Sequence, residues 1–231
     1  MDITWIGSSC FSLQSGPLLI LTDPFDLPGS ASDLAALLDS PDIVTVSRRA
    51  ARDRLQVNGA YRVVDGPGEY EIKGVPVTGI ATAAGGPPAP QEGEPRVAAE
   101  RNVVYTISFG SVSVCHLGRL DRPLSAQQLQ EIGSPDVLLL PLGEGTGLPV
   151  ARAVELANQL ESRILIPMTF DGPGDEAAVE RFCREFGADA ANFVPRLTVT
   201  SSGSSSQVQV ARLAPARPPG QGHGAAGAGP A

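Results

Sequence analysis

The sequence predicts an α/β sandwich with β-sheets inside and α-helices outside, and three observations support this. Short apolar or alternating segments open the chain at residues 2–7, 10–15 and 17–23, separated by turn residues. Continuous apolar segments at 136–141 and 163–168 are typical of strands covered on both faces. Helical patterns follow the strands in both halves of the chain, as expected where helices pack against sheets.

The first half continues with one predicted helix and four further strands. Residues 30–40 begin with serine and aspartate and then place leucines at helical spacing, so we expect a short amphipathic helix. A buried strand at 43–46 ends at Ser47. Three more strands are expected at 61–65, 68–72 and 75–82.

The second half begins with a predicted hairpin, formed by strands at 102–109 and 111–118 around a tight Gly-Ser turn. A helix is expected at 125–133, because Ser125 and Gln128 form a capping box and Gly133 can close the helix in a left-handed conformation. Two further helices are predicted from apolar residues at helical spacing: Val150, Ala153, Val154, Ala157 and Leu160 in one, and Val179, Phe182, Cys183 and Phe186 in the other.

The chain has 231 residues, which suits one globular domain, and we assign that domain to residues 1–213. Residues 83–100 are rich in Ala, Gly and Pro, so we expect a mobile loop between the two halves. The tail at 214–231 is rich in the same residues and cannot bury enough apolar surface to offset the entropy of ordering. We therefore expect it to be disordered.

Charge and cysteine content exclude several classes of protein. The net charge of −8 disfavours a general attraction to nucleic acid or to an anionic membrane. No apolar segment approaches the ~18 to 20 residues needed to cross a bilayer. Three widely spaced cysteines, Cys10, Cys115 and Cys183, show no disulfide pattern, which favours a cytoplasmic protein. Only His116 and His223 are histidines, and His223 lies in the tail.

Several phrases of the sequence together resemble the small zinc-dependent hydrolases of the metallo-β-lactamase superfamily. They run in the same order over most of residues 1–200: "ITWIGSSCFSL", "ILTDPFD", "IVTVS", "DGPGEYEIKGVPVTGI", "VCHLGRL" and "VLLLPLGEG". The nearest branch looks like the ascorbate-phosphate lactonase-like proteins. The resemblance implies a four-layer αββα sandwich whose site lies at the sheet edges between the two halves.

The positions that hold metal ligands in this family carry other residues here. The family's HxHxDH motif corresponds to Arg48, Ala50, Arg52 and Asp53. The family's other ligand positions hold Ser8 in place of an early histidine, Arg119 in place of a bridging aspartate and Thr169 in place of a late histidine. Zinc, the cofactor that the resemblance implies, is therefore not supported by these residues, and we predict no metal site.

Elementary chemistry leads to the same expectation. A catalytic zinc ion needs about three protein ligands, which are usually imidazole, carboxylate or thiolate. A guanidinium group remains protonated and has no lone pair for coordination, so it repels a dication. Arginine at a ligand position therefore opposes metal binding.

Arg48, Arg52 and Arg119 are candidates for an anion site, with His116 beside them. If they converge, fixed positive charge would replace the metal charge and could hold a phosphate or carboxylate through bidentate hydrogen bonds. The simpler interpretation is that the arginines face water or form ion pairs with acidic neighbours: Asp53, Asp65, Glu69 or Asp121.

Other polar residues have simpler structural interpretations. A lone strand histidine such as His116 is more often a hydrogen-bonded structural residue than a catalyst, and Cys115 beside it should face the opposite side of the sheet. Cys10 and Cys183 fit buried apolar positions. Asp23 can form an Asx turn before Pro24. Glu69 and Glu71 should share one strand face, and the glycine-rich segment 142–149 is a connecting loop or an anion cradle.

Three classes of function follow. The first is a metal-free relative without catalytic activity that binds an anionic small molecule or a protein partner. The second is a metal-dependent hydrolase with an unusual ligand set drawn from His116, Asp53, Asp65 and a carboxylate from the C-terminal side of the chain. The third is a structural or interaction protein whose cleft is filled by side chains. Whether the protein is an enzyme is left open by the sequence, because activity depends on the site and not on the fold.

Overall fold

The computed structural model describes residues 1–25, 27, 40–83, 101–143, 147–170, 174–200 and 208–216. The predicted helix at 30–40, except for Ser40, lies outside these residues, as does almost all of the loop predicted at 83–100. The described chain continues to Ala216, three residues beyond the predicted domain boundary. Its amide donates to the carbonyl of Trp5 at 2.7 Å, which ties this end of the chain to the first strand.

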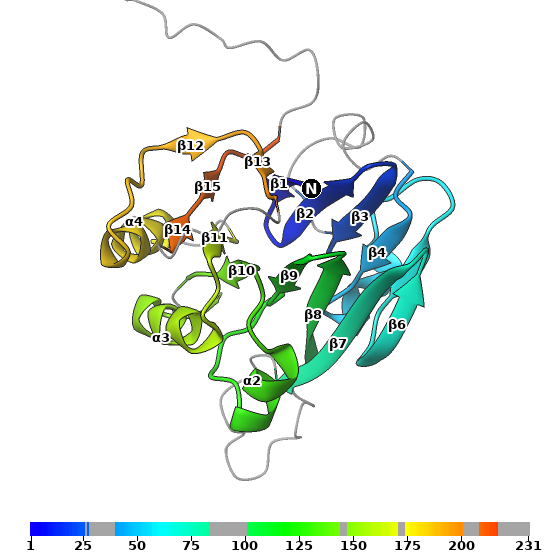
Figure 1. The fold of residues 1–231 in the computed structure, drawn as a ribbon, viewed down its shortest axis with the longest axis horizontal. Coiled ribbons are helices and arrows are strands. Elements are labelled where there is room, and N and C mark those ends of the chain that lie inside the picture. Colours follow the sequence, from blue (N-terminus) through cyan, green and yellow to red (C-terminus); the bar gives the residue numbers. More distant parts are fainter. Residues whose placement is uncertain are drawn as a thin grey trace, which may run out of the picture.

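Two sheets form the centre of the described part of the chain (Figure 1). The first sheet has six strands in the order β13 (Leu197–Thr198), β1 (Asp2–Gly7), β2 (Cys10–Ser15), β3 (Leu18–Thr22), β4 (Ile43–Thr45) and β5 (Arg62–Val64). The second has seven, in the order β14 (Gln209–Val210), β11 (Ile164–Met168), β10 (Val137–Pro141), β9 (Val112–His116), β8 (Arg101–Phe109), β7 (Val75–Ala83) and β6 (Gly68–Ile72).

Each sheet is mixed. In the first, β1, β2 and β3 pair antiparallel, whereas β3, β4 and β5 run parallel. In the second, β6 to β9 form an antiparallel meander, and β9, β10, β11 and β14 are parallel. A small pair, β12 (Phe193–Val194) with β15 (Arg212–Leu213), stands apart from both sheets. The two-residue strands after residue 190 were not predicted from the sequence, because such short segments carry little periodicity.

Strand alternation divides the apolar residues among three layers of core. One layer lies between the sheets and joins Phe11, Leu13 and Ile20 of the first to Val77, Tyr105 and Leu139 of the second. The opposite face of the second sheet packs against the helices. The outer face of the first sheet packs on Phe25, Leu27 and Ala51, the last of which lies in the 3₁₀ helix η1 (Arg49–Arg54).

The helices of the described residues are α2 (Ala126–Ile132), α3 (Val150–Leu160) and α4 (Asp175–Glu185). They lie on one side of the molecule, away from β1 to β4 (Figure 1), and they cover the second sheet. The predicted capping box of α2 is confirmed: the Gln128 amide donates to the Ser125 hydroxyl, and the Gln128 side chain accepts from the Ser125 amide.

The predicted sandwich of inner sheets and outer helices is therefore confirmed, and several local predictions need correction. Gly133 ends α2 with φ 70° and ψ −143°, which is not a left-handed helical conformation. On α3 the residues Ala153, Ala157 and Leu160 are buried as predicted, but Val150 and Val154 are only half-buried. The three cysteines are free and buried. No helix of the described residues is long and apolar enough to cross a membrane.

Candidate functional site

The candidate site lies at the edge of the sandwich where β4 and β9 end, and two loops meet there. Ser47 follows β4 of the first sheet, and Gly118 follows β9 of the second. A Cβ atom on Gly118 would lie 2.5 Å from the Cβ atom of Ser47, so only glycine allows the two loops to approach this closely. Gly118 also has φ +60°, which favours glycine. Arg48 and Arg119 are the next residues in these loops, and the fold therefore brings their backbones side by side.

Asp23 holds the first of these loops in place. Its carboxylate accepts hydrogen bonds from both the amide of Ser47, at 2.6 Å, and the hydroxyl of Ser47. Asp23 is fully buried and has φ 43°, an uncommon conformation for a residue with a side chain. The predicted Asx turn at Asp23 is wrong, because the carboxylate bonds a residue 24 positions away and not its own turn.

Asn102 of β8 holds the second loop. Its side-chain oxygen accepts from the amide of Arg119 at 2.9 Å, and its side-chain nitrogen donates to the carbonyl of Leu117 at 3.0 Å. The same nitrogen donates to the hydroxyl of Thr82 on β7 at 2.9 Å. Asn102 was not predicted as a site residue from the sequence. Its signal was a polar residue inside an apolar strand, a position that requires hydrogen-bond partners.

The three arginines predicted to form an anion site have different surroundings. The Arg48 guanidinium lies 5.3 Å from the centroid of the Phe25 ring, and that of Arg119 lies 4.3 Å from the centroid of Phe170. Such contacts stabilise a cation over an aromatic face. Arg52 is half-exposed and forms an ion pair with Asp65 at 2.5 Å, one of the pairings expected for a structural role. Arg48 and Arg119 thus come from adjacent loops, and Arg52 lies on η1 in an ion pair with Asp65.

His116 lies beneath this edge and inside the protein. It is fully buried and shares the inner face of β9 with Val112 and Val114, so its ring lies between the two sheets. Cys115 packs on the helix side, as alternation predicts. Burial lowers the pKa of His116, although the Asp23 carboxylate and the Ser9 backbone oppose this shift. The imidazole is therefore neutral near pH 7 and does not contact solvent, which excludes direct contact with an exposed anion.

Because the sequence resembles zinc-dependent hydrolases, the residues at this edge are possible metal ligands. Asp53 lies exposed on η1, and the alternative ligand Asp65 pairs with Arg52. Within the described ranges, no three His, Cys, Asp or Glu side chains gather closely enough to hold a metal ion. The described residues therefore do not fit a catalytic metal, because such a site needs about three ligands of these types.

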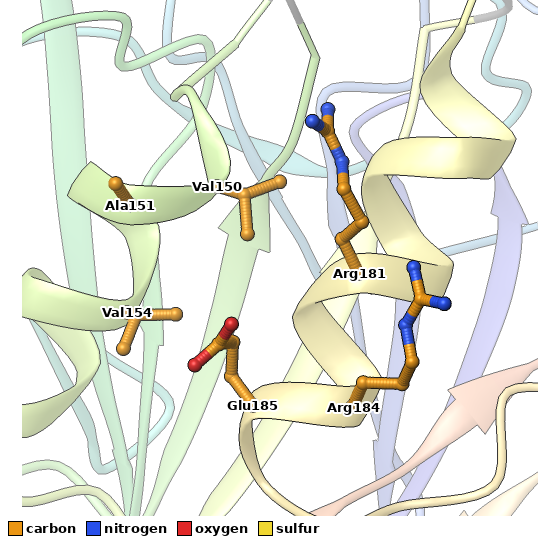
Figure 2. Close-up of a pocket in the computed structure, with 6 residues that line it drawn as sticks. All are labelled: Val150, Ala151, Val154, Arg181, Arg184 and Glu185. Carbon is orange, nitrogen blue, oxygen red and sulfur yellow. The ribbon is translucent and has the colours of Figure 1, made fainter.

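A separate open groove of about 800 Å³ lies between α3 and α4, away from the sheet edge. It is lined by Val150, Ala151, Val154, Arg181, Arg184 and Glu185. Figure 2 shows Val150 and Val154 facing α4, with the carboxylate of Glu185 pointing towards α3. None of the predicted site residues lines this groove.

The paired mixed sheets, the outer helices and a site at the sheet edge define a metallo-β-lactamase fold. The chain belongs to the β-lactamase superfamily, whose domain model matches residues 2–169. Relatives described as UPF0173 metal-dependent hydrolases include one from Methanoculleus marisnigri, which is 30% identical over 80% of this chain and 88% of its own length. Another, from Archaeoglobus fulgidus, is 25% identical over 74% of this chain and 84% of its own length.

Solved structures agree with this assignment. A protein from Thermotoga maritima, assigned to the zinc-dependent hydrolases of the metallo-β-lactamase superfamily, matches with a TM-score of 0.69 and 29% identity, covering 92% of this chain and 99% of that protein. The metallo hydrolase Igni18 from Ignicoccus hospitalis has a TM-score of 0.60 at 14% identity, over 86% of this chain and 99% of that protein. The second likeness concerns the fold alone.

Proposed function

We propose that this chain is a metal-free member of its family that binds an anionic small molecule at the Arg48–Arg119 edge and has no hydrolase activity. The observation that carries the proposal is the placement of two guanidinium groups on the two loops joined by Ser47 and Gly118. These loops correspond to the family's metal-binding loops, so permanent positive charge takes the place of a dication there.

The charge of the whole chain makes this edge distinctive. A protein with net charge −8 repels anions in general, so any anion site must be built from local cations. Phe25 and Phe170 restrict the two guanidinium groups by stacking, which lowers the entropy lost when an anion binds. A phosphate or a carboxylate accepts paired hydrogen bonds from such groups. A phosphorylated small molecule is the first class to test, in keeping with the resemblance to the ascorbate-phosphate lactonase-like branch.

The experiment has two parts. The protein would be expressed in zinc-supplemented medium and analysed for bound metals, and we expect far less than one equivalent of zinc, manganese or iron. Calorimetry with inorganic phosphate and with succinate would then measure anion binding. We expect an Arg48→Gln, Arg119→Gln double variant to weaken binding of the preferred anion at least tenfold. An Arg152→Gln variant serves as the control, since Arg152 pairs with Glu155 on α3.

Two results would contradict the proposal. Near-stoichiometric metal, lost on substitution of Asp53 or His116, would favour the second candidate, a metal-dependent hydrolase with an unusual ligand set. That candidate is supported by the relatives described as metal-dependent hydrolases. If the double variant bound each anion, phosphate or succinate, with the same affinity as the wild type, the cleft would be idle. A protein partner would then be the remaining ligand class to test.

A further inference from the structure

Three polar side chains are buried close to the Arg48–Arg119 edge. Asp23, Thr45 and His116 are all fully buried. Among the described residues, the two ring nitrogens of His116 and the hydroxyl of Thr45 have no hydrogen-bond partner. Buried polar atoms of folded proteins are almost always bonded, to protein or to ordered water, so these three atoms require an explanation.

Strand alternation directs Thr45 and His116 into the same layer. Thr45 lies two residues after Ile43 on β4, and His116 lies two residues after Val114 on β9. Ile43 and Val114 both belong to the core between the sheets. Side chains two residues apart on a strand share a face, so Thr45 and His116 also face the opposite sheet. They approach this layer from opposite sides.

Backbone and side-chain bonds place Asp23 and Ser9 beside them. Thr22 is the register partner of Thr45, and its hydroxyl donates to the carbonyl of Ser9 at 2.8 Å. The Ser9 backbone and the Asp23 carboxylate both favour the protonated form of His116. No hydrogen bond of ordinary length and angle joins either of them to the ring. One oxygen of Asp23 accepts from the Ser47 amide and the other from the Ser47 hydroxyl. A carboxylate oxygen can accept two hydrogen bonds, so each has capacity for another donor.

An ordered water can bridge buried polar groups that do not bond each other directly. A buried water needs two to four polar partners, which Asp23, Thr45 and His116 can supply. A larger anion is excluded by the complete burial of these groups and by the carboxylate. We propose that Asp23, Thr45 and His116 form an internal site for one ordered water molecule, which joins the two sheets below the candidate anion site.

This water would link the two arginine loops, which are the loop with Ser47 and Arg48 and the loop with Gly118 and Arg119. Asp23 bonds Ser47, the residue before Arg48, and His116 lies two residues before Gly118, which contacts Ser47. A water shared by Asp23 and His116 thus closes a polar connection between the ends of β4 and β9. The site does not depend on whether an anion binds at the edge, so the two proposals succeed or fail separately.

Magnetic relaxation dispersion of water nuclei counts long-lived internal waters and tests the proposal directly. We expect His116→Phe and Thr45→Val each to lose one long-lived water, and the double variant to lose no more than either single variant. Thr82→Val is the matched control: the buried Thr82 hydroxyl donates to the Asn102 carbonyl at 3.1 Å and accepts from the Asn102 side chain, so this variant should leave the count unchanged.

A second measurement uses the unaltered protein and does not depend on the variants folding. A nuclear Overhauser effect from a long-lived water to the Thr45 methyl group and to the His116 ring is expected. An unchanged count of internal waters in both folded single variants would overturn the proposal. So would a scalar coupling that shows a direct hydrogen bond from the His116 ring to the Asp23 carboxylate.

Discussion

Ser47 and Gly118 are in contact across the two sheets, and this contact sets the distance between the two arginine loops. The contact leaves no room for a side chain on Gly118, whose Cβ atom would also lie 2.5 Å from the Oδ1 atom of Asn102. Both neighbours are fixed by hydrogen bonds, Ser47 to Asp23 and Asn102 to Arg119. Neither can move aside without breaking one of them.

We therefore expect Gly118→Ala to destabilise the protein by about 2 to 5 kcal/mol. About 1 to 2 kcal/mol comes from the left-handed conformation and about 1 to 3 kcal/mol from overpacking. Chemical denaturation measures the effect. Gly110→Ala is the matched control, since Gly110 has φ +63° with no atom within 4 Å of its Cβ position, and it should lose only the conformational part. Equal losses in both variants would contradict the tight contact at Gly118.

The buried imidazole of His116 predicts a loss of stability in mild acid. Its pKa in the folded protein is lowered, whereas the unfolded chain has the ordinary value near ~6.5. The unfolded state therefore binds the proton first, and stability is complete above about pH 6.5 and falls as the pH decreases towards the folded pKa. The slope approaches roughly 1.4 kcal/mol per pH unit for one proton.

Urea denaturation between pH 7 and pH 5 checks this dependence. The pKa values of Asp42 and Asp136 are lowered, the first by its hydrogen bond from Lys73 and the second by bonds from Ser113 and Arg163 that outweigh its burial. These carboxylates therefore titrate below the window. We expect His116→Phe to flatten the profile and His223→Gln to leave it unchanged. A wild-type profile that is already flat would show that His116 is not the titrating group.

The ion pair between Arg52 and Asp65 should contribute little to the free energy of unfolding. The Arg52 side chain is 50% exposed, and exposed pairs typically contribute about 0 to 1 kcal/mol because water and salt screen them. We expect Arg52→Gln to cost less than about 1 kcal/mol, with the loss disappearing at high salt. Its affinity for inorganic phosphate should equal that of the wild type in calorimetry. A tenfold loss of phosphate affinity would place Arg52 in the anion site after all.

Arg212 should anchor the C-terminal strand β15 more strongly than a typical surface arginine. Its side chain is 10% exposed, donates to the Ala190 carbonyl at 2.5 Å, pairs with Glu176 and lies 3.9 Å from the centroid of Phe193. We expect Arg212→Leu to lower stability by about 1 to 3 kcal/mol, since the Ala190 carbonyl loses its donor. Arg196→Leu is the control, because the Arg196 side chain is 63% exposed and its ion pair with Asp2 is longer, at 3.5 Å. Similar decreases in melting temperature in the two variants would contradict the anchoring role of Arg212.

Much of the fold could be predicted because it depends on local signals. Alternation and apolar segments predicted β1 to β11 within a few residues, and the Ser125–Gln128 capping box located the start of α2. The two-residue strands β12 to β15 were missed, because their pairing depends on distant partners and not on their own pattern. The helix predicted at 30–40 is tested by no described residue other than Ser40.

The sequence by itself determined which chemistry is present: two histidines in all, and arginine at positions 48, 52 and 119. Only the tertiary structure decided which of these residues meet. It joined Ser47 to Gly118, gave Asp23 a partner 24 residues away and enclosed His116 between the sheets. The physical reason is that residue types fix charge and hydrogen-bonding capacity locally, whereas contacts between segments depend on how the two sheets pack, which no short stretch of sequence encodes.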